Sequence, residues 1–327
     1  MLESENLPSF LIKPKEEEKE EISHINISLE KGLVAHKQII INYLTKFPSG
    51  NFITGAKDTC LKIWNFEYKL IQEIQIAHDS FINYINVKDE NTFASCSNDR
   101  HIKIWKKQFN FYINIIKLTN AHEDGITKVL FYKKNKLISS SLDGKIKIWE
   151  FLNNNSNNSY INNIQYQCIS VLSFSNSIKS ILLLEERDIG ISIGNCAKIF
   201  SLKTYEYLFS IEEIEIYGKN AVCKLDEDKI IVGGYFYNMK IFSLNKKKII
   251  KEIDNGFRCL CICALKDKGV FLTGGLIPNV KIYRISDFKC IQILKGAHNH
   301  SIQGFQIFSN DILASYSYDG IVKFWKY

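Results

Sequence analysis

Apolar and polar residues alternate in short runs along most of the chain, and residues 121–151 show this pattern most clearly. The stretch contains three apolar runs, ITKVLF, KLISSS and KIKIWEF, which are separated by turn-prone residues. The alternation in KIKIW is typical of a β-strand with one buried face. The intervening SLDG favours a tight turn, because Asp and Gly tolerate its backbone and Asp can bond back to it. The stretch therefore predicts three antiparallel strands.

The same strand pattern recurs at a nearly constant spacing. Equivalent strands end in the aromatic residues Trp64, Trp105, Trp149, Phe200, Phe242, Tyr283 and Trp325. The steps between these aromatics are 41, 44, 51, 42, 41 and 42 residues. The one long step contains the Asn-rich sequence FLNNNSNNSYINN, which we interpret as a loop insert at about residues 151–163. Seven copies of one unit predict a repeat protein.

Four of the seven copies also share four polar side chains at fixed spacing. A His lies 21 or 22 residues before an Asp, a Thr or Ser lies four residues before that Asp, and a Trp lies six residues after it. We expect one buried hydrogen-bond network in each of these copies, with the hydroxyl linking imidazole to indole and the Asp accepting from imidazole. The four predicted tetrads are His36, Thr54, Asp58 and Trp64; His78, Ser95, Asp99 and Trp105; His122, Ser139, Asp143 and Trp149; and His298, Ser315, Asp319 and Trp325.

This pattern resembles the WD-repeat family, and the resemblance covers residues 22–327. Repeats of that family, about 40–45 residues long, each form one four-stranded blade of a β-propeller. The resemblance therefore implies an all-β fold, a seven-bladed β-propeller of four-stranded antiparallel blades. The chain departs from the family pattern in three ways. No copy has a literal Trp-Asp pair, each tetrad His follows Ala instead of Gly, and the three middle copies lack both His and Asp.

The two ends of the chain predict how the ring closes. The last copy stops at its third strand, IVKFWKY, whereas residues 22–34 contain a spare strand with alternating Ile25, Ile27 and Leu29. Pairing the two would close the ring and remove an exposed sheet edge. Residues 22–327 are thus expected to form the propeller. Residues 1–21, with seven Glu and three Lys, predict an acidic, disordered tail.

Composition and charge narrow the class of protein. The net charge of +7 suits anionic partners, but the aromatic and basic interleaving of RNA-binding sheets is absent. No apolar run approaches the length of a transmembrane helix, and the first residues lack the pattern of a signal peptide. Nine scattered Cys favour reduced thiols, and hence a cytoplasmic or nuclear location.

The sequence predicts no enzyme, cofactor or metal site. It contains no G-x-x-x-x-G-K-[ST], H-E-x-x-H or G-x-S-x-G motif. Four similar His–Asp pairs spaced around a ring indicate a structural role and argue against four active sites. Cys259, Cys261 and Cys263 are expected on one face of a single strand, which cannot wrap a metal ion.

The predicted binding surface is the face that carries the His loops and the Asp turns. Side chains expected to point toward it are Gln38, Ser80, Asp124, Lys179, Asn220, Arg258, His300, Lys57, Asn98, Leu142 and Tyr318, together with Tyr235, Phe236 and Tyr237 in a turn of the fifth copy. Arg and Tyr are common in interface hot spots. The candidate partner-binding residues are therefore Lys57, Lys179, Tyr235, Tyr237, Arg258, His300 and Tyr318.

The resemblance implies a non-catalytic scaffold that binds peptide or protein partners on this face. Such a propeller is expected to be monomeric within a larger complex, with no membrane insertion. Two more specific roles stay open at this stage. One is the substrate receptor of a ubiquitin ligase, and the other is a component of an RNA-processing or ribosome-assembly complex, which only the basic charge suggests.

Overall fold

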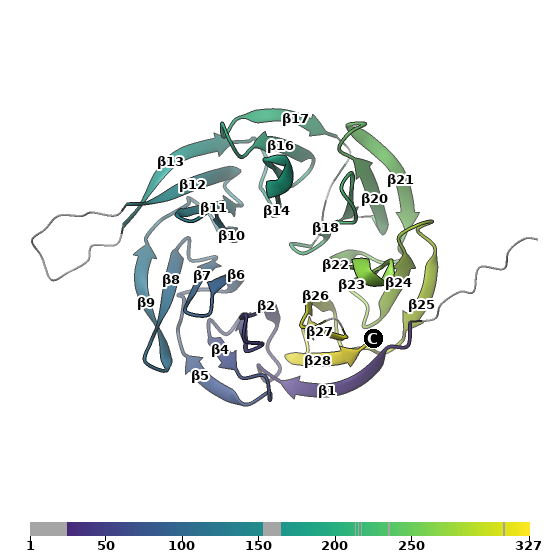
Figure 1. Ribbon diagram of the computed structural model, residues 1–327, viewed down its shortest axis with the longest axis horizontal. Coiled ribbons are helices and arrows are strands. Elements are labelled where there is room, and N and C mark those ends of the chain that lie inside the picture. Colours follow the sequence, from purple (N-terminus) through teal and green to yellow (C-terminus); the bar gives the residue numbers. More distant parts are fainter. Residues whose placement is uncertain are drawn as a thin grey trace, which may run out of the picture.

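The computed structural model describes residues 25–152, 165–212, 214, 216, 218–234, 236–309 and 311–327. Within these residues the strands form seven four-stranded antiparallel sheets, which stand round a common axis (Figure 1). This seven-bladed β-propeller confirms the predicted fold class. The predicted tail at residues 1–21 and residues 153–163 of the predicted insert lie outside the described residues, whereas residues 151 and 152 end a strand.

Each blade runs from an innermost strand near the axis to an outermost strand at the rim. Blades 1 to 3 comprise β2 (Ile41–Lys46), β3 (Phe52–Ala56), β4 (Leu61–Trp64) and β5 (Leu70–Ile74); β6 (Ile82–Asp89), β7 (Thr92–Ser97), β8 (Ile102–Gln108) and β9 (Phe111–Leu118); and β10 (Ile126–Tyr132), β11 (Lys136–Ser141), β12 (Lys145–Leu152) and β13 (Gln165–Ser173).

Blades 4 to 6 follow in the same order. They comprise β14 (Ser180–Leu184), β15 (Ile189–Ile193), β16 (Ala197–Ser201) and β17 (Tyr207–Ile211); β18 (Val222–Lys224), β19 (Lys229–Gly233), β20 (Asn238–Ser243) and β21 (Lys248–Asp254); and β22 (Cys259–Leu265), β23 (Val270–Gly275), β24 (Val280–Arg284) and β25 (Cys290–Leu294). Short 3-10 turns, η1 (Glu185–Arg187) and η2 (Lys266–Lys268), join the first two strands of blades 4 and 6.

Blade 7 is built from both ends of the described chain. It contains β26 (Ile302–Ile307), β27 (Ile312–Ser317), β28 (Ile321–Lys326) and, as its outermost strand, β1 (Ser28–Val34). The antiparallel register runs from Ser28 opposite Lys326 to Val34 opposite Ile321. The backbone N–H groups of Ala35 and His36 then both donate to the carbonyl of Gly320. This pairing confirms that the N-terminal strand closes the ring.

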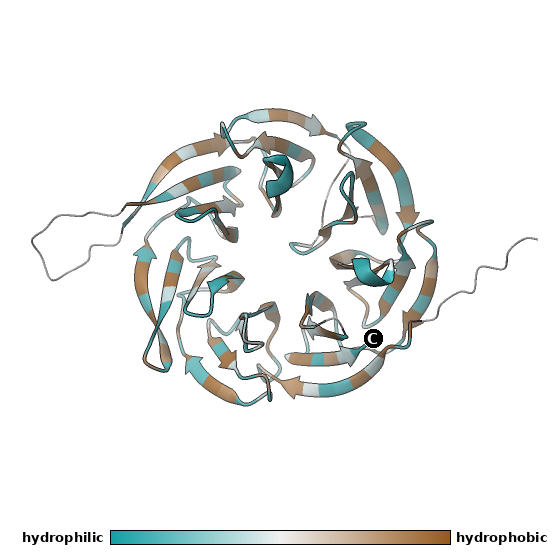
Figure 2. Cartoon of the chain, viewed as in Figure 1, coloured by the Kyte–Doolittle hydropathy of each residue, from teal (hydrophilic) through white to brown (hydrophobic). Residues whose placement is uncertain are grey.

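The hydrophobic core lies between neighbouring blades rather than within one blade. Second strands such as β3 are buried at every residue, because each sheet is covered on both faces by its neighbours. The outermost strands alternate apolar and polar residues along their length (Figure 2). One core cluster joins Ile53 and Ile63 of blade 1 to Ile82 and Phe93 of blade 2. Each blade therefore depends on contacts with the next one for its stability.

Blade 4 departs most from the common pattern. Phe200 stands where four other blades carry Trp, and its ring covers Gly190 on the neighbouring strand β15. A Cβ at Gly190 would lie 2.1 Å from Cζ of Phe200, so only glycine leaves room for this ring. The small residue thus replaces the large apolar residue, such as Phe93, that pairs with the aromatic elsewhere.

Candidate functional site

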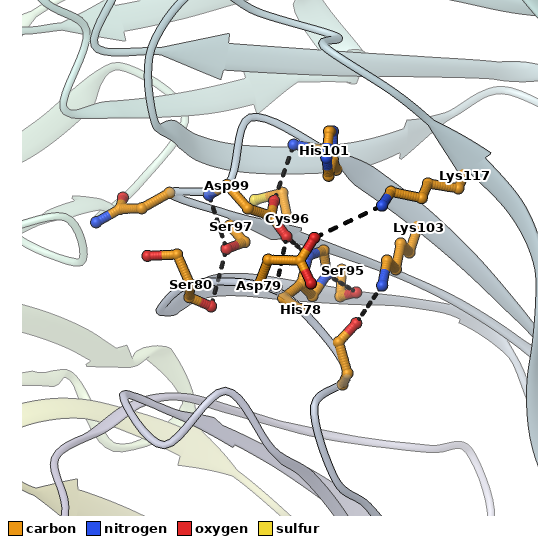
Figure 3. A network of polar contacts seen from close by, with 12 residues as sticks. His78, Asp79, Ser80, Ser95, Cys96, Ser97, Asp99, His101, Lys103 and Lys117 are labelled. Atoms are coloured by element: carbon orange, nitrogen blue, oxygen red, sulfur yellow. Dashed lines mark hydrogen bonds and ion pairs between the residues drawn. The ribbon is translucent and has the colours of Figure 1, made fainter.

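The structure brings each of the four predicted tetrads together within one blade. In blade 2, His78 Nδ1 lies 2.8 Å from Asp99 Oδ2, and His78 Nε2 lies 2.7 Å from Ser95 Oγ (Figure 3). The indole N–H of Trp105 donates to the same Ser95 oxygen at 2.8 Å. The His and hydroxyl side chains are buried, and the Asp lies in the turn between the second and third strands.

The other three tetrads have the same geometry, with corresponding distances of 2.6–3.1 Å. Their Asp residues and His loops all lie at one end of the sheets, which we call the upper face. The repetition indicates that the tetrads hold the upper-face turns in place. A turn that carries a fixed carboxylate in every tetrad blade gives the face a defined shape.

The four groups form one continuous chain of donors and acceptors when the imidazole is neutral. Indole N–H can only donate, so the Ser95 oxygen accepts it, and the Ser95 hydroxyl can then donate to Nε2 of a neutral His78 ring. In this arrangement the ring N–H at Nδ1 donates to Asp99. Burial lowers the pKa of His78, which agrees with a neutral ring at pH 7.

The Asp99 carboxylate is held in its charged form. Burial alone would raise its pKa, but hydrogen bonds from the His78 ring and from the backbone N–H groups of His101 and Asp79 hold the pKa well below 3.8. Asp143 and Asp319 show the same direction with the same kinds of donor. In blades 2 and 3 the tetrad therefore joins a neutral buried ring to an ionised carboxylate in the turn.

The protein is expected to lose stability as the pH falls below about 6.5. Burial lowers the pKa values of His78 and His122, so the unfolded chain binds protons that the folded protein cannot accept. The contribution of these two rings to stability is complete at pH values above the His pKa of the unfolded chain. It decreases as the pH falls toward their lower pKa values in the folded protein. Asp99 and Asp319 act in the same direction at lower pH, because their folded-state pKa values are also depressed.

Urea unfolding midpoints between about pH 8 and pH 4 would check this expectation. A midpoint that rises on acidification would contradict it, since both kinds of group predict a fall.

Blade 6 contains a related network that the sequence pattern did not reveal. The Asn255 side-chain oxygen accepts hydrogen bonds from Thr273 Oγ1 at 3.1 Å and from the Tyr283 hydroxyl at 2.9 Å. Asn255 precedes Thr273 by 18 residues, the same interval that separates His36 from Thr54. A search by spacing rather than by residue type would have found it. Asn255 thus takes the place of the tetrad His.

A central depression lies on the upper face, with a volume of about 380 Å³. Its wall brings together five blades of the ring. The lining residues are Asn42 and Lys57 from blade 1; Phe81, Asn83 and Asn98 from blade 2; Gly218, Lys219 and Asn220 next to β18 of blade 5; Leu260 from blade 6; and Gln303 and Tyr318 from blade 7. Its size falls within the range of sites that bind small ligands or a few peptide side chains.

Lys219 reaches across the axis from blade 5 to blade 2. Its ammonium group donates to the side-chain oxygen of Asn83. The side-chain nitrogen of Asn83 in turn donates to Asn98 Oδ1 and to the carbonyl of Ile126, which holds the amide in place. The Ser180 hydroxyl donates to the carbonyl of Lys219 at 2.7 Å. Burial lowers the pKa of Lys219 to about 8. These contacts fix a cation at the centre of the upper face.

Close packing holds the same segment against blade 6. A Cβ at Gly218 would lie 2.2 Å from the carbonyl oxygen of Leu260, so the backbone approaches as only glycine permits. The Asn220 amide donates to the carbonyl of Gln303 at 3.0 Å and to the Tyr316 hydroxyl at 3.2 Å. Residues 218–220 are therefore tied to blades 2, 4, 6 and 7.

On the innermost strands β2 and β6, the residues that directly follow the wall residues Asn42 and Asn83 are aromatic. The Tyr43 and Tyr84 rings lie 3.9 Å apart between centroids, and the Tyr84 ring lies 5.1 Å from Lys128 Nζ. Lys128 is buried and donates to the carbonyl of Ile181. Burial lowers the pKa of Lys128 to about 8. These side chains pack against one another next to the wall residues Asn42 and Asn83.

The candidate partner-binding residues fall into two groups. Lys57 and Tyr318 line the depression, and His300 stacks on Tyr318 with 5.3 Å between ring centroids. Lys179 donates to the carbonyl of Ile216, and Arg258 is partly exposed without lining the depression. Tyr237 is about half exposed on blade 5. Tyr235 lies outside the described residues.

Several lining residues were not among the candidates. Asn98 and Asn220 were expected on the upper face without a binding role, and Lys219 was missed although it precedes Asn220 directly. Gly218 next to them offered a signal, because glycine often marks a close backbone approach. The others are Asn42, Phe81, Asn83, Leu260 and Gln303.

One expectation about the cysteines was wrong. Cys259 packs in the core between blades 5 and 6, whereas Cys261 and Cys263 pack in the core between blades 6 and 7. A β-bulge between Cys259 and Cys261 shifts the register, so residues two apart no longer share a face. Within the described ranges no group of His, Cys, Asp and Glu side chains could hold a metal ion. Over the same ranges, no helix is long and apolar enough to span a membrane.

Comparison with known proteins identifies the repeats. A family model described as "WD domain, G-beta repeat" matches residues 28–65, 69–106 and 114–150. Each matched segment starts on the outermost strand of one sheet and ends on the third strand of the next. The matches thus cover blades 1 to 3, the consecutive blades with complete tetrads.

Curated relatives of the chain include two that are named as WD repeat-containing proteins. The "WD repeat-containing protein 55 homolog" of Drosophila virilis is 24% identical over 283 residues, which is 84% of this chain and 44% of the relative. The "Nuclear distribution protein nudF" of Aspergillus flavus is 29% identical over 115 residues, 34% of this chain and 25% of the relative.

The "Probable coatomer subunit beta'" of Schizosaccharomyces pombe is 28% identical over 108 residues, 32% of this chain and 13% of the relative. The "F-box/WD repeat-containing protein sel-10" of Caenorhabditis elegans is 25% identical over 100 residues, 30% of this chain and 16% of the relative. The chain spans less than half the length of each of these four relatives.

Proposed function

Because the chain is a seven-bladed WD-repeat β-propeller, we propose that it is a non-catalytic scaffold that binds a peptide or protein partner on its upper face. The observation that carries this proposal is the central depression, whose wall combines amide, cationic and aromatic side chains from five blades. Peptide recognition uses such mixtures, because amides pair with peptide groups while aromatic rings supply apolar contact area.

Rigidity supports the same role. Tetrads fix the upper-face turns in blades 1, 2, 3 and 7, and residues 218–220 are tied to four blades. A surface that is already ordered loses little conformational entropy when a partner binds. The scaffold therefore offers a preformed site rather than one that assembles around its ligand.

The two more specific roles stay predictions. One relative is named as an F-box/WD repeat-containing protein and another as a coatomer subunit, so the names of similar proteins point to different assemblies. The chain matches only a small part of each of these relatives. The nine unpaired thiols support a cytoplasmic or nuclear location as part of the proposal.

Replacing Tyr318 by alanine is expected to weaken partner capture about tenfold or more without unfolding the protein. Its ring lies in the wall of the depression and stacks on His300, so truncation removes contact area from the upper face. Affinity capture with quantitative mass spectrometry, comparing wild type with Tyr318→Ala, measures the loss. Arg258→Ala extends the test to blade 6.

Phe109→Ala provides the matched control. Phe109 is 97% exposed in the turn between β8 and β9, at the opposite end of the sheets, so its loss should leave capture unchanged. Partners that depend on Tyr318 and not on Phe109 would support binding on the upper face. Equal capture by all variants would contradict it.

A further inference from the structure

We propose that the central depression binds an acidic side chain, Asp or Glu, carried by a peptide segment of the partner. This inference rests on the proposed function and names the chemistry of the partner that the upper face holds. Three features of the described part of the wall point to it: two lysines with no Asp or Glu among its residues, an amide donor without an acceptor, and two aromatic rings.

The two lysines come from distant blades, but Lys219 reaches across the axis, so both ammonium groups lie beside residues of blade 2. Lys57 belongs to the turn after β3 of blade 1, and Lys219 precedes β18 of blade 5. Lys57 Nζ lies 5.2 Å from the ring centroid of Phe81 and 5.6 Å from that of Tyr318, so two rings hold the cation in position. Among the residues that the structure describes, none that lines the wall is Asp or Glu. The depression is therefore positively charged.

Two donors of the wall, on Gln303 and Lys219, have hydrogen-bonding capacity to spare. The side-chain nitrogen of Gln303 is buried and has no hydrogen-bond partner in the described part of the chain. The Lys219 ammonium carries three hydrogens, and Asn83 takes one of them. Leaving a buried donor unpaired costs free energy, which a bound acceptor recovers. A carboxylate supplies up to four acceptor positions and a negative charge. It can therefore accept from these donors and also balance the positive charge of the two lysines.

The remaining features favour a peptide over a nucleic acid. A nucleic acid strand brings many phosphates, and binding it calls for a basic track along the backbone. The described residues of the wall offer two cations, both beside blade 2 in one hollow. Phe81 is 41% exposed beside Lys57, and it suits an apolar residue next to the acidic one. The occupant that fits is a peptide segment with one or two acidic residues and an apolar neighbour.

Selection of random peptides tests the inference without knowledge of the natural partner. A displayed library of random peptides is selected on the immobilised full-length protein, and in parallel on Lys219→Ala and on Lys57→Gln. Peptides enriched on wild type are expected to share an acidic residue at one position. The two variants are expected to lose this preference, because each removes one cation from the wall.

Affinity measurement then isolates the contribution of the charge. A fluorescein-labelled selected peptide is titrated by fluorescence anisotropy, together with its counterpart in which Gln replaces the shared Glu or Asn replaces the shared Asp. We expect affinity to fall about tenfold or more on this replacement, on Lys219→Ala and on Lys57→Gln. Gln303→Met, which keeps the size but removes the donor, should also weaken binding.

Lys37→Ala serves as the control for net charge. Lys37 follows His36 in an upper-face loop, is exposed and does not line the depression, so this variant should bind the peptide as wild type does. Thermal unfolding of every variant shows whether Lys219→Ala disturbs the fold. If Lys219→Ala disturbs the fold, Lys57→Gln still tests the inference, because it leaves the Lys219 contacts in place.

The possible failures are distinguishable. If no peptide is enriched on wild type, the proposed function fails together with the inference. If enriched peptides lack a shared acidic residue, or bind Lys219→Ala and Lys57→Gln as well as wild type, the inference alone is overturned. Displacement of the labelled peptide from the depression by a single-stranded oligonucleotide at physiological salt would also overturn it, because the occupant would then be a nucleic acid.

Discussion

Deleting residues 25–34 is expected to lower the midpoint of thermal unfolding by about 10 °C and to make the protein aggregate. Strand β1 pairs with β28 from Ser28 to Val34, and backbone hydrogen bonds contribute about 1 kcal/mol each to stability. Loss of this ladder leaves β28 as an open edge and uncovers one side of blade 7. Differential scanning fluorimetry and light scattering measure the two effects.

A synthetic peptide of residues 25–36 provides the matching rescue. Added to the truncated protein, it should pair with β28 and restore part of the lost thermal stability. The same peptide with Pro in place of Leu33 should not, because proline cannot donate to the ladder. An unchanged midpoint after truncation would show that ring closure by β1 contributes little.

Replacing His78 by alanine is expected to destabilise the protein by about 3 kcal/mol. The ring is fully buried, and its loss leaves a cavity and removes the hydrogen-bond partner of both Ser95 and Asp99. Trp105 would still donate to the Ser95 oxygen, but the Ser95 hydroxyl would no longer have the His78 nitrogen as its acceptor. Urea unfolding followed by tryptophan fluorescence measures the change.

His101 offers a control in the same blade. It is partly exposed, and its ring accepts only a surface hydrogen bond from the backbone of Asn120, so His101→Ala should cost less than about 1 kcal/mol. If the two alanine variants were equally stable, the buried relay would have no structural role. His78→Ala should also show a smaller loss of stability on acidification than wild type, because one buried ring no longer titrates.

The sequence predicted those parts of the molecule that repeat. The aromatic residues from Trp64 to Trp325 gave the number of blades, because identical packing problems around a ring demand similar residues at a constant interval. The spare strand before residue 35 predicted the closure of blade 7, since an unpaired edge is costly. Four tetrads were recognisable because their residue types recur together with their spacing.

The parts that differ from blade to blade could not be predicted in this way. Asn255 performs the role of a His with a different side chain, so a search for identical residues passes over it. Lys219 contacts Asn83, which lies 136 residues away in sequence, and no local pattern reports such a contact. The bulge between Cys259 and Cys261 changes the face of a strand through one extra residue. Each of these features depends on tertiary packing.

Pairing of β1 with β28 also has a consequence for the order of events during synthesis. The ribosome makes β1 before any other strand of the propeller and β28 after all the others. The nascent chain can therefore stack its blades as they emerge, but β1 finds no partner until translation has passed Lys326. The growing array therefore keeps an open edge at each end until β28 is made and pairs with β1.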